Sequence, residues 1–471
     1  LFCVCLLGVL SFHMLSLRRQ KRYHDFYLDQ REQKPEDRIR EALGSPWIEG
    51  YMTKKGRVVK SWRRRYFVLR YGVLSYYKNS NIRGEESLGS LRLDEFQVRD
   101  TTSTNEIPEL RRKTRTMTTM YNGGSSSRKT QFAGFRSPED AIADVAEYKF
   151  PFSIESPSRS LLMSAQSEME RFAWVTAIKA SIRIENYVAR CSEFSCDPIT
   201  SVGRALANEL TDTVVVENLT LSFNRVSTLI QTLLEAQHIR CLSLNHTGLS
   251  DAFGQPLGEI LAEKELRVLN LAHNRISGFG LQEMVHGLFL NVTLVHLDLS
   301  YNSIRDNGAR VIADFIKSSS SLKECSLSHN KIEAPGAESL AGSLFCSLSL
   351  ESLDLSFNCL GDDGARAMGK GLVGSKSLTS LSLGANNIKD GIVEFAEFLK
   401  SNSTLKKLEL SANHIDKAGS RALISAVSQH KQLSSLDIGC NQSLKAESMS
   451  ELAEALHSTF EVSRLVVRRD L

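Results

Sequence analysis

Lysine and arginine side chains that could bind an anionic ligand are concentrated between positions 51 and 70. Eight basic residues and no acid occur there, although the whole chain of 471 residues has a net charge of only +4. Arginine offers a planar fork to phosphate oxygens, and lysine offers a point charge. This composition favours a local phosphate site over a general nucleic-acid interface, which would spread basic residues over a whole face. The eight residues are Lys54, Lys55, Arg57, Lys60, Arg63, Arg64, Arg65 and Arg70.

Three predicted strands carry this basic segment. Residues 48–53 alternate loosely in polarity, whereas residues 66–69 and 73–77 are aromatic and β-branched, which is typical of half-buried strands. Gly56 lies between the first two strands, where a hairpin would turn.

The alternation of side chains along a strand decides which cations meet. Arg63 and Arg65 would share one face, and Lys54 would face them across the hairpin. This arrangement predicts a pocket for a multiply phosphorylated ligand. The alternative is a basic strand that is simply solvated.

The same residues resemble the first three strands of pleckstrin homology (PH) domains. The pattern is Lys54, then Lys60-Ser-Trp-Arg63-Arg-Arg65-Tyr-Phe-Val-Leu, then Leu74-Ser-Tyr76-Tyr. In members that bind phosphoinositides, the lysine, the two cations after the tryptophan and the third-strand tyrosine contact the inositol phosphates. The resemblance therefore implies a phosphoinositide site, to which we add two neighbouring cations. The predicted site is Lys54, Arg57, Lys60, Arg63, Arg65 and Tyr76.

A second part of the resemblance lies at residues 168–178. Phe172, Trp174, Val175 and Ile178 recur at helical spacing, which looks like the closing helix of the family with its buried tryptophan. We expect this helix to run to about Ile184. Further strands are expected at residues 88–93, 96–99, 148–155 and 160–165, and a low-complexity insertion at residues 100–147.

A repeat fills the second half of the chain, from about Val214 to Val467. Its unit, L-x-x-L-x-L-x-x-N-x-I, recurs at steps of 27 or 28 residues, with looser copies from Val216, Ile239 and Val462. This resembles the ribonuclease-inhibitor class of leucine-rich repeats. The copies start at Leu266, Leu294, Leu322, Leu350, Leu378, Leu405 and Leu433, and the ladder asparagines are Asn274, Asn302, Asn330, Asn358, Asn386, Asn413 and Asn441.

The repeat unit predicts a curved solenoid. Short parallel strands would bury leucines inward, the asparagine would satisfy backbone groups of the turn, and outer helices would bend the stack. The predicted fold is thus multidomain: a small antiparallel β-barrel capped by a C-terminal α-helix, then an α/β leucine-rich-repeat horseshoe. The predicted parts are an apolar segment (1–17), a charged linker (18–44), a PH-like domain (45–186), a linker or cap (187–211) and the repeat domain (212–471).

One column of the concave face carries exposed rings. The residue before the ladder asparagine is aromatic or histidine in four successive repeats, and acids occupy four of the seven places in the column between the inner leucines. Aromatic residues beside acids predict a protein-binding stripe, although rings could also merely pack along a strand edge. The predicted stripe is His273, Tyr301, His329, Phe357, Asp298 and Asp354.

No constellation of residues predicts an enzyme, a cofactor or a metal site. Residues 364–371, GARAMGKG, look like a phosphate-binding loop but end in glycine where Ser or Thr should ligate magnesium, and the repeat register explains them. Nine cysteines, an odd number without framework spacing, indicate a reducing compartment.

The N-terminal segment, residues 1–17, is apolar and is followed by four basic residues within positions 18–22. At about 1.5 Å per residue it falls short of a hydrocarbon core of about 30 Å. Two hypotheses stay open: the tail of a single-pass anchor, which would leave the following chain in the cytosol, or a sequence artefact. Both leave the folded domains cytosolic.

These patterns favour a cytosolic adaptor that docks on phosphoinositide-bearing membranes and presents its repeats to an unknown protein partner. The alternative is a GTPase-activating or actin-regulatory protein. Ran GTPase activators share the repeats, and the CARMIL actin regulators share the order of modules. In that case the PH-like module would be a protein-binding domain. The phosphoinositide isomer, the partner and the oligomeric state are not predicted.

Overall fold

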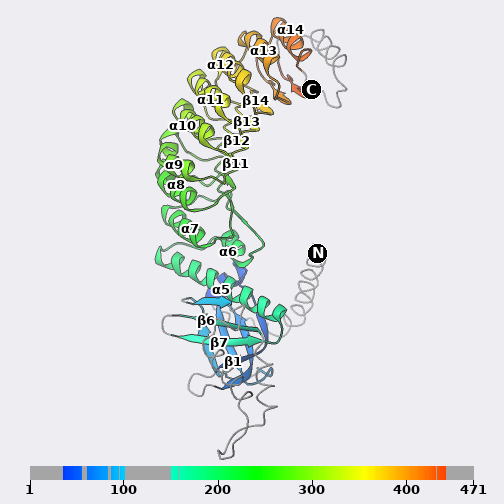
Figure 1. Cartoon of the computed structure of the whole chain (residues 1–471). Helices are drawn as coiled ribbons and strands as arrows, with labels where there is room; N and C mark the ends of the chain where they lie inside the picture. Colours follow the sequence, from blue (N-terminus) through cyan, green and yellow to red (C-terminus); the bar gives the residue numbers. More distant parts are fainter. Residues whose placement is uncertain are drawn as a thin grey trace, which may run out of the picture.

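The computed structural model describes residues 35–55, 61–82, 86–94, 96–100, 150–156, 159–430 and 432–441 (Figure 1). Several sequence predictions lie outside these residues. They concern residues 1–17, the turn at Gly56, the site residues Arg57 and Lys60, the insertion beyond residue 100 and the last repeat copy from Val462.

Within the described residues, seven strands form one antiparallel, curled sheet in the order β4-β3-β2-β1-β7-β6-β5. The predicted strands are found, although the second begins at Trp62 and not at residue 66. Their bounds are β1 Ile48–Lys55, β2 Trp62–Arg70, β3 Val73–Tyr77, β4 Gly89–Arg92, β5 Gln97–Asp100, β6 Phe150–Glu155 and β7 Ser160–Ala165.

Alternate residues of these strands form the barrel core, which helix α5 (Glu168–Glu193) closes. Ser167 caps the helix, since its side chain accepts a hydrogen bond from the backbone N–H of Glu170. Trp174 is buried, with its ring edge-on to Phe67 at a centroid distance of 6.4 Å. The buried closing tryptophan is therefore confirmed. Phe172 also lies in this helix, on its exposed side, with 68% of the side chain exposed.

Helix α5 also continues past the predicted end at Ile184, to Glu193. The extra turns carry Tyr187 and Cys191, which are buried in the core of the repeat region and not in that of the barrel. The Tyr187 hydroxyl accepts a hydrogen bond from the backbone N–H of Ile199 at 2.7 Å. A single helix thus belongs to both hydrophobic cores.

The repeat region contains a parallel sheet of nine strands among the described residues, with helices along its outer side (Figure 1). In these three-residue strands the middle residue is buried and the other two are partly exposed on the concave face, as in β10, β11 and β13. The strands are β8 Thr213–Val215, β9 Cys241–Ser243, β10 Val268–Asn270, β11 His296–Asp298, β12 Glu324–Ser326, β13 Ser352–Asp354, β14 Ser380–Ser382, β15 Lys407–Glu409 and β16 Ser435–Asp437.

Helices alternate with these strands, as the repeat predicts. The copy expected from Val216 begins earlier, because β8 aligns Val214 with Leu242 of β9. The helices are α6 Thr200–Ala207, α7 Phe223–Glu235, the 3-10 helix η2 Asp251–Phe253, α8 Gly254–Glu263, α9 Gly278–Leu290, α10 Arg305–Ser318, α11 Ala334–Cys346, α12 Gly361–Gly374, α13 Gly391–Ser401 and α14 Lys417–Val427.

The ladder asparagines form the hydrogen bonds to backbone groups that the repeat unit predicts. Asn302 donates from its amide to the Leu271 and Leu299 carbonyls at 3.0 Å, and its Oδ1 accepts from the Ile276 N–H at 2.9 Å. Each such side chain therefore satisfies backbone groups of two successive repeats. Leaving one buried group unpaired would cost about 1–3 kcal/mol.

A second polar ladder, which the sequence did not reveal, lies where the outer helices end. Asn291 and Asn402 are C-cap residues whose buried amides donate to carbonyls of the preceding repeat. Lys264, at the equivalent place, donates from Nζ to the Leu233 and Ala236 carbonyls at 2.8 and 2.7 Å, and burial lowers its pKa to about 8.

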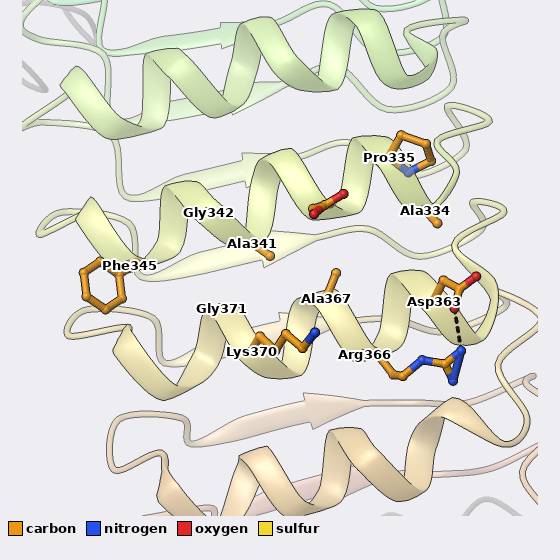
Figure 2. A pocket seen from close by; sticks show the side chains of 11 residues that line it. Ala334, Pro335, Ala341, Gly342, Phe345, Asp363, Arg366, Ala367, Lys370 and Gly371 are labelled. Atoms are coloured by element: carbon orange, nitrogen blue, oxygen red, sulfur yellow. Dashed lines mark hydrogen bonds and ion pairs between the residues drawn. The ribbon is translucent and has the colours of Figure 1, made fainter.

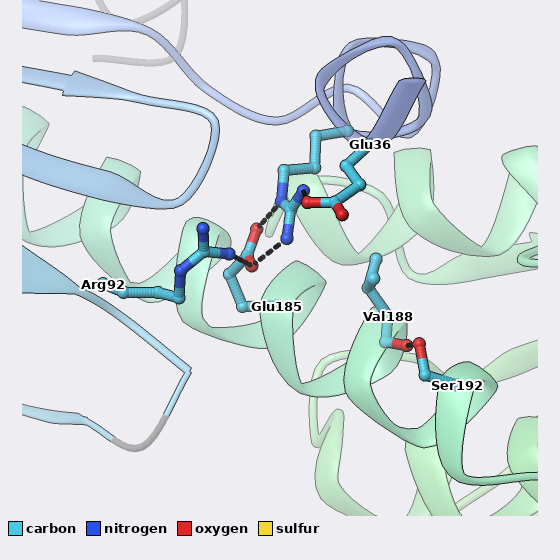
Figure 3. A network of polar contacts seen from close by, with 6 residues as sticks. Glu36, Arg92, Glu185, Val188 and Ser192 are labelled. Atoms are coloured by element: carbon cyan, nitrogen blue, oxygen red, sulfur yellow. Dashed lines mark hydrogen bonds and ion pairs between the residues drawn. The ribbon is translucent and has the colours of Figure 1, made fainter. Parts of the chain in front are cut away.

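The barrel and the repeats meet at a joint that we define by Glu185, Arg40 and Arg92. Arg40 of helix α2 (Pro35–Ala42) donates to both oxygens of the buried Glu185, at 2.7 and 2.9 Å. Arg92 of β4 approaches the same carboxylate at 3.8 Å. Figure 3 shows Glu185 between Arg92 and α2.

The turn between β2 and β3 completes this joint. A Cβ at Gly72, whose φ is +71°, would lie 2.2 Å from a Glu185 oxygen, so only glycine leaves room for the carboxylate. Leu43, just after α2, is part of the core of the repeat region. Segments far apart in sequence thus hold the two modules together.

Candidate functional sites

The predicted cations lie at the end of the barrel where β1 finishes and β2 begins. Lys54 stands directly opposite Arg63, and Arg65 stands opposite Met52. Met52 and Phe67 on the same face are buried in the core. Lys54, Arg63 and Arg65 therefore lie on the inner face of the sheet, beyond its buried part. We call this set the barrel mouth.

Tyr76 of β3 completes the barrel mouth. The Lys54 Nζ lies 3.7 Å from the centroid of the Tyr76 ring, a cation–π contact. Tyr76 faces Gly89 of β4, where a Cβ would lie 2.4 Å from the phenol oxygen. The ring therefore depends on a glycine that sequence reasoning did not single out.

Arg64 lies on the opposite face of β2. Its guanidinium sits over the Tyr51 ring at 4.5 Å, and the Tyr51 hydroxyl accepts from the Ser80 N–H at 3.1 Å. The Arg65 side chain folds back along the strand, donating from Nη1 to the Arg64 carbonyl at 2.8 Å. The alternation of faces thus separates Arg64 from the predicted site.

The charges at the barrel mouth have no acidic partner in the part of the chain that the structure describes. Among the described residues, no carboxylate forms an ion pair with Lys54, Arg63 or Arg65. The structure therefore brings four predicted site residues, these three and Tyr76, to one end of the barrel. The other two predicted residues, Arg57 and Lys60, lie outside the described residues.

The rings of the repeat region form one continuous stack. His273 and Tyr301 lie 3.9 Å apart between centroids, Tyr301 and His329 3.7 Å, and His329 and Phe357 4.1 Å, with interplanar angles of 14–16°. The predicted aromatic column is thus a face-to-face stack. We call it the ring stack.

The backbone under the ring stack is left-handed. His273, Tyr301, His329 and Phe357 have φ values of 53–55°, and Ala385 at the next equivalent position has 52°. The backbone N–H groups are satisfied, for example that of Tyr301 by the Ser328 carbonyl. A non-glycine residue in this region costs roughly 1–2 kcal/mol, and the equivalent Ala412 and Cys440 have φ values of 53° and 57°, so this backbone belongs to the repeat unit and not to the rings.

His329, inside the ring stack, has a lowered pKa. Burial between neighbouring rings disfavours its charged form, whereas Asp354 acts in the opposite direction. The neutral imidazole is therefore the favoured form within the stack.

Asp298 and Asp354, the predicted acids, have a structural part as well. Oδ1 of each accepts hydrogen bonds from the backbone N–H and the hydroxyl of the serine two residues later, Ser300 and Ser356. These acids therefore stabilise the turn beneath the rings while remaining half-exposed.

A groove on the outer side of the solenoid, of about 480 Å³, lies between α11 and α12 (Figure 2). Lys370 and Gly371, from the segment that resembles a phosphate loop, line it, and Arg366 pairs with Asp363. That segment lies inside helix α12, so it does not form a loop that could enclose a phosphate. This agrees with the interpretation of the segment as part of the repeat.

Two family models match the chain. The PH domain model matches residues 46–183, and the Leucine Rich repeat model matches five segments: 265–285, 290–313, 318–341, 346–369 and 401–423. The chain therefore contains a PH domain followed by leucine-rich repeats. Both are typically non-enzymatic modules, and they support a signalling adaptor or scaffold with lipid and protein binding.

Curated relatives match shorter stretches. Pleckstrin homology domain-containing protein 1 of Arabidopsis thaliana is 25% identical over 142 residues, which are 30% of this chain and 72% of that protein. A probable serine/threonine-protein kinase of Dictyostelium discoideum is 42% identical over 40 residues, which are 8% of this chain. The chain spans only 2% of the length of that kinase.

Solved PH domains are similar to part of the chain. The C-terminal PH domain of pleckstrin, in a crystal structure with D-myo-Ins(1,2,3,5,6)P5, is 19% identical and covers 29% of this chain and 97% of its own, with a TM-score of 0.19. The PH domain of human oxysterol binding protein-related protein 11 is 16% identical and covers 30% of this chain and 85% of its own, with a TM-score of 0.20.

Of the helices in the described part of the chain, none combines the length and the apolar character that crossing a bilayer requires. The apolar residues 1–17 lie outside that part.

Proposed function

We propose that this chain is a phosphoinositide-binding adaptor that is recruited peripherally to membranes from the cytoplasm. The barrel mouth would bind the headgroup through Lys54, Arg63, Arg65 and Tyr76, together with the neighbouring Arg57 and Lys60. The repeats would bind a protein partner on the concave face, along the ring stack and its acids. The chain would then act by holding that partner near the membrane, which raises its local concentration.

One observation carries the lipid-binding proposal. Three cations share the end of the barrel and no described carboxylate pairs with them. Charges kept together without counter-charges repel one another, so a multiply charged anion would bind there with favourable Coulomb energy. Arginine forks suit phosphate oxygens particularly well.

A liposome panel tests this proposal. The whole chain is sedimented with vesicles of phosphatidylcholine that contain phosphoinositides with one, two or three added phosphates. Vesicles with phosphatidylserine at the same total charge serve as the control. We expect at least tenfold tighter binding to one phosphoinositide class. Equal binding to all vesicles of equal charge would show a diffuse basic surface instead.

The proposed adaptor has no enzymatic activity of its own. A GTP hydrolysis assay with Ran separates it from a GTPase activator. We expect the hydrolysis rate to be unchanged when the chain is added, and an accelerated rate would overturn the non-enzymatic part of the proposal.

A further inference from the structure

The ring stack has two unlike ends. At the end nearest the barrel, His246 lies against His273, with centroids 6.3 Å apart, and is itself held by a 2.9 Å contact to Asn218 Oδ1. At the other end, the position after Phe357 holds Ala385, which has the same left-handed backbone. The Phe357 face on that side therefore has no ring of the described chain upon it.

The exposure of the rings agrees with this difference. Phe357 is 53% exposed, whereas the larger Tyr301 inside the stack is 43% exposed. The next equivalent position, Ala412, is again small and again left-handed. The stack thus ends in the open face of Phe357, and the next two equivalent positions, Ala385 and Ala412, hold only small side chains.

A second departure from the repeat occurs next to Ala385. The residue before Ala385 is Gly384, where the three preceding repeats have Ser300, Ser328 and Ser356. A Cβ at Gly384 would lie 2.9 Å from Glu409 Oε1. The missing side chain therefore lets this carboxylate lie close to the backbone at Gly384. We call Phe357, Ala385 and Glu409 the shelf.

The shelf carries negative charge. Asp354 lies in the repeat of Phe357, and no described lysine or arginine forms an ion pair with Asp354 or Glu409. Ser411 donates to Glu409 Oε1 at 2.9 Å and so fixes the carboxylate. Lys407 is the cation on the same face of β15, two residues before Glu409.

From this geometry we infer that the shelf binds the guanidinium of an arginine side chain presented by a protein partner. Guanidinium is planar, so it can lie on the open Phe357 face and continue the stack, while its N–H groups reach a carboxylate edge. A lysine ammonium cannot stack in this way. A phosphorylated or other anionic ligand is disfavoured by Glu409 and Asp354.

This inference deepens the proposed function, since it rests on the proposal that the ring stack and its acids bind a protein. It names one chemical group of that partner and one place for it. The sequence alone could not indicate the site, because the column after Phe357 shows only two alanines. The open ring face follows from the stacking distances and from the similar backbone at Ala385.

Small probes test the shelf with the whole chain. Ligand-observed saturation-transfer NMR titrations compare N-acetyl-arginine N-methylamide with its lysine and citrulline counterparts and with adenosine. Citrulline keeps the planar shape without the charge, and lysine keeps the charge without the plane. We expect the arginine probe to bind about fivefold more tightly than either. Equal binding of arginine and lysine probes, or tighter binding of adenosine, would overturn the inference.

Variants locate the binding. Ala385→Phe would extend the ring stack over the shelf, and Glu409→Gln would remove its charge, so both should abolish the arginine preference. His246→Ala, at the closed end of the stack, is the matched control and should leave it unchanged. Loss of the preference in the control, or its retention in Ala385→Phe, would place the binding elsewhere. Circular dichroism melting confirms that each variant is folded.

The proposed function can fail independently. Once a partner has been identified, Tyr301→Ala with Phe357→Ala should reduce its capture. If this double variant loses capture but the wild-type chain shows no preference for the arginine probe, arginine binding at the shelf is refuted and protein binding along the ring stack is supported. If capture is unchanged, the face itself is wrong.

Discussion

Arginine side chains lie at both ends of the barrel, but the two ends differ in whether a described carboxylate pairs with them. At the barrel mouth, Arg63 and Arg65 have no described carboxylate partner. At the joint, Arg40 and Arg92 converge on the buried Glu185. Strand β2 runs from one end to the other, with a rise of roughly 3.3 Å per residue. The comparison indicates that cations at the joint stabilise the fold, whereas those at the mouth have no carboxylate partner in the described part of the chain.

Glu185→Ala should give the largest effect and would break the comparison at the joint. Removing one partner of a buried ion pair leaves uncompensated charge and costs about 3–5 kcal/mol. We expect the free energy of unfolding, measured by urea denaturation, to fall by about 4 kcal/mol.

Arg63→Ala at the mouth is the matched variant and should change stability by less than about 0.5 kcal/mol. A comparable loss of stability in both variants would show that the two ends do not differ in the way described.

Asn330→Ala should have the next largest effect. Asn330 is fully buried, donates to the Leu299 and Ser328 carbonyls and accepts from the Ile304 N–H. We expect a loss of about 3 kcal/mol, because several backbone groups lose their partner. Asn307→Ala, at an exposed position of helix α10, should stay within about 0.5 kcal/mol of wild type.

A smaller effect concerns pH. Burial lowers the pKa of His430, whose Nδ1 accepts from the Leu433 N–H at 3.0 Å and so requires the neutral ring. A lowered pKa in the folded state means that stability is full above the ordinary histidine pKa of about 6.5 and is lost as pH falls below it. Stability measured between pH 7 and 5.5 should therefore decline, by less than the effect of Asn330→Ala.

His430→Asn is the variant that isolates this titration. Asn402, one repeat earlier, makes the equivalent contact, since its Oδ1 accepts from the Leu405 N–H at 2.8 Å. Asparagine should therefore keep the contact without titrating, and the decline should become shallower. The same slope in both proteins would assign the pH dependence to other groups, such as His238 and His329, whose pKa values are also lowered.

Much of the fold could be predicted because its signals are local. The period of 27 or 28 residues places every strand from β10 to β16, and alternation along β1 and β2 places Lys54 opposite Arg63. These patterns need no knowledge of distant contacts. The separation of Arg64 from the barrel mouth follows from the same alternation.

The joint and the shelf could not be predicted because they depend on distant contacts. Arg40 and Glu185 are 145 positions apart, and no periodicity connects them. The length of α5 depends on Tyr187 and Cys191 packing in the repeat core, which a PH-like pattern does not foresee. Likewise, the stacking distances between the rings and the approach of Glu409 to Gly384 join residues of different repeats.

The most direct test compares two arginines that are neighbours in the sequence and face opposite ways. Arg65→Ala removes a cation of the barrel mouth, whereas Arg64→Ala removes one from the other face of β2. We predict that Arg65→Ala weakens binding to phosphoinositide vesicles at least tenfold and that Arg64→Ala weakens it less than threefold. Equal losses in the two variants would contradict a defined phosphate site at the barrel mouth.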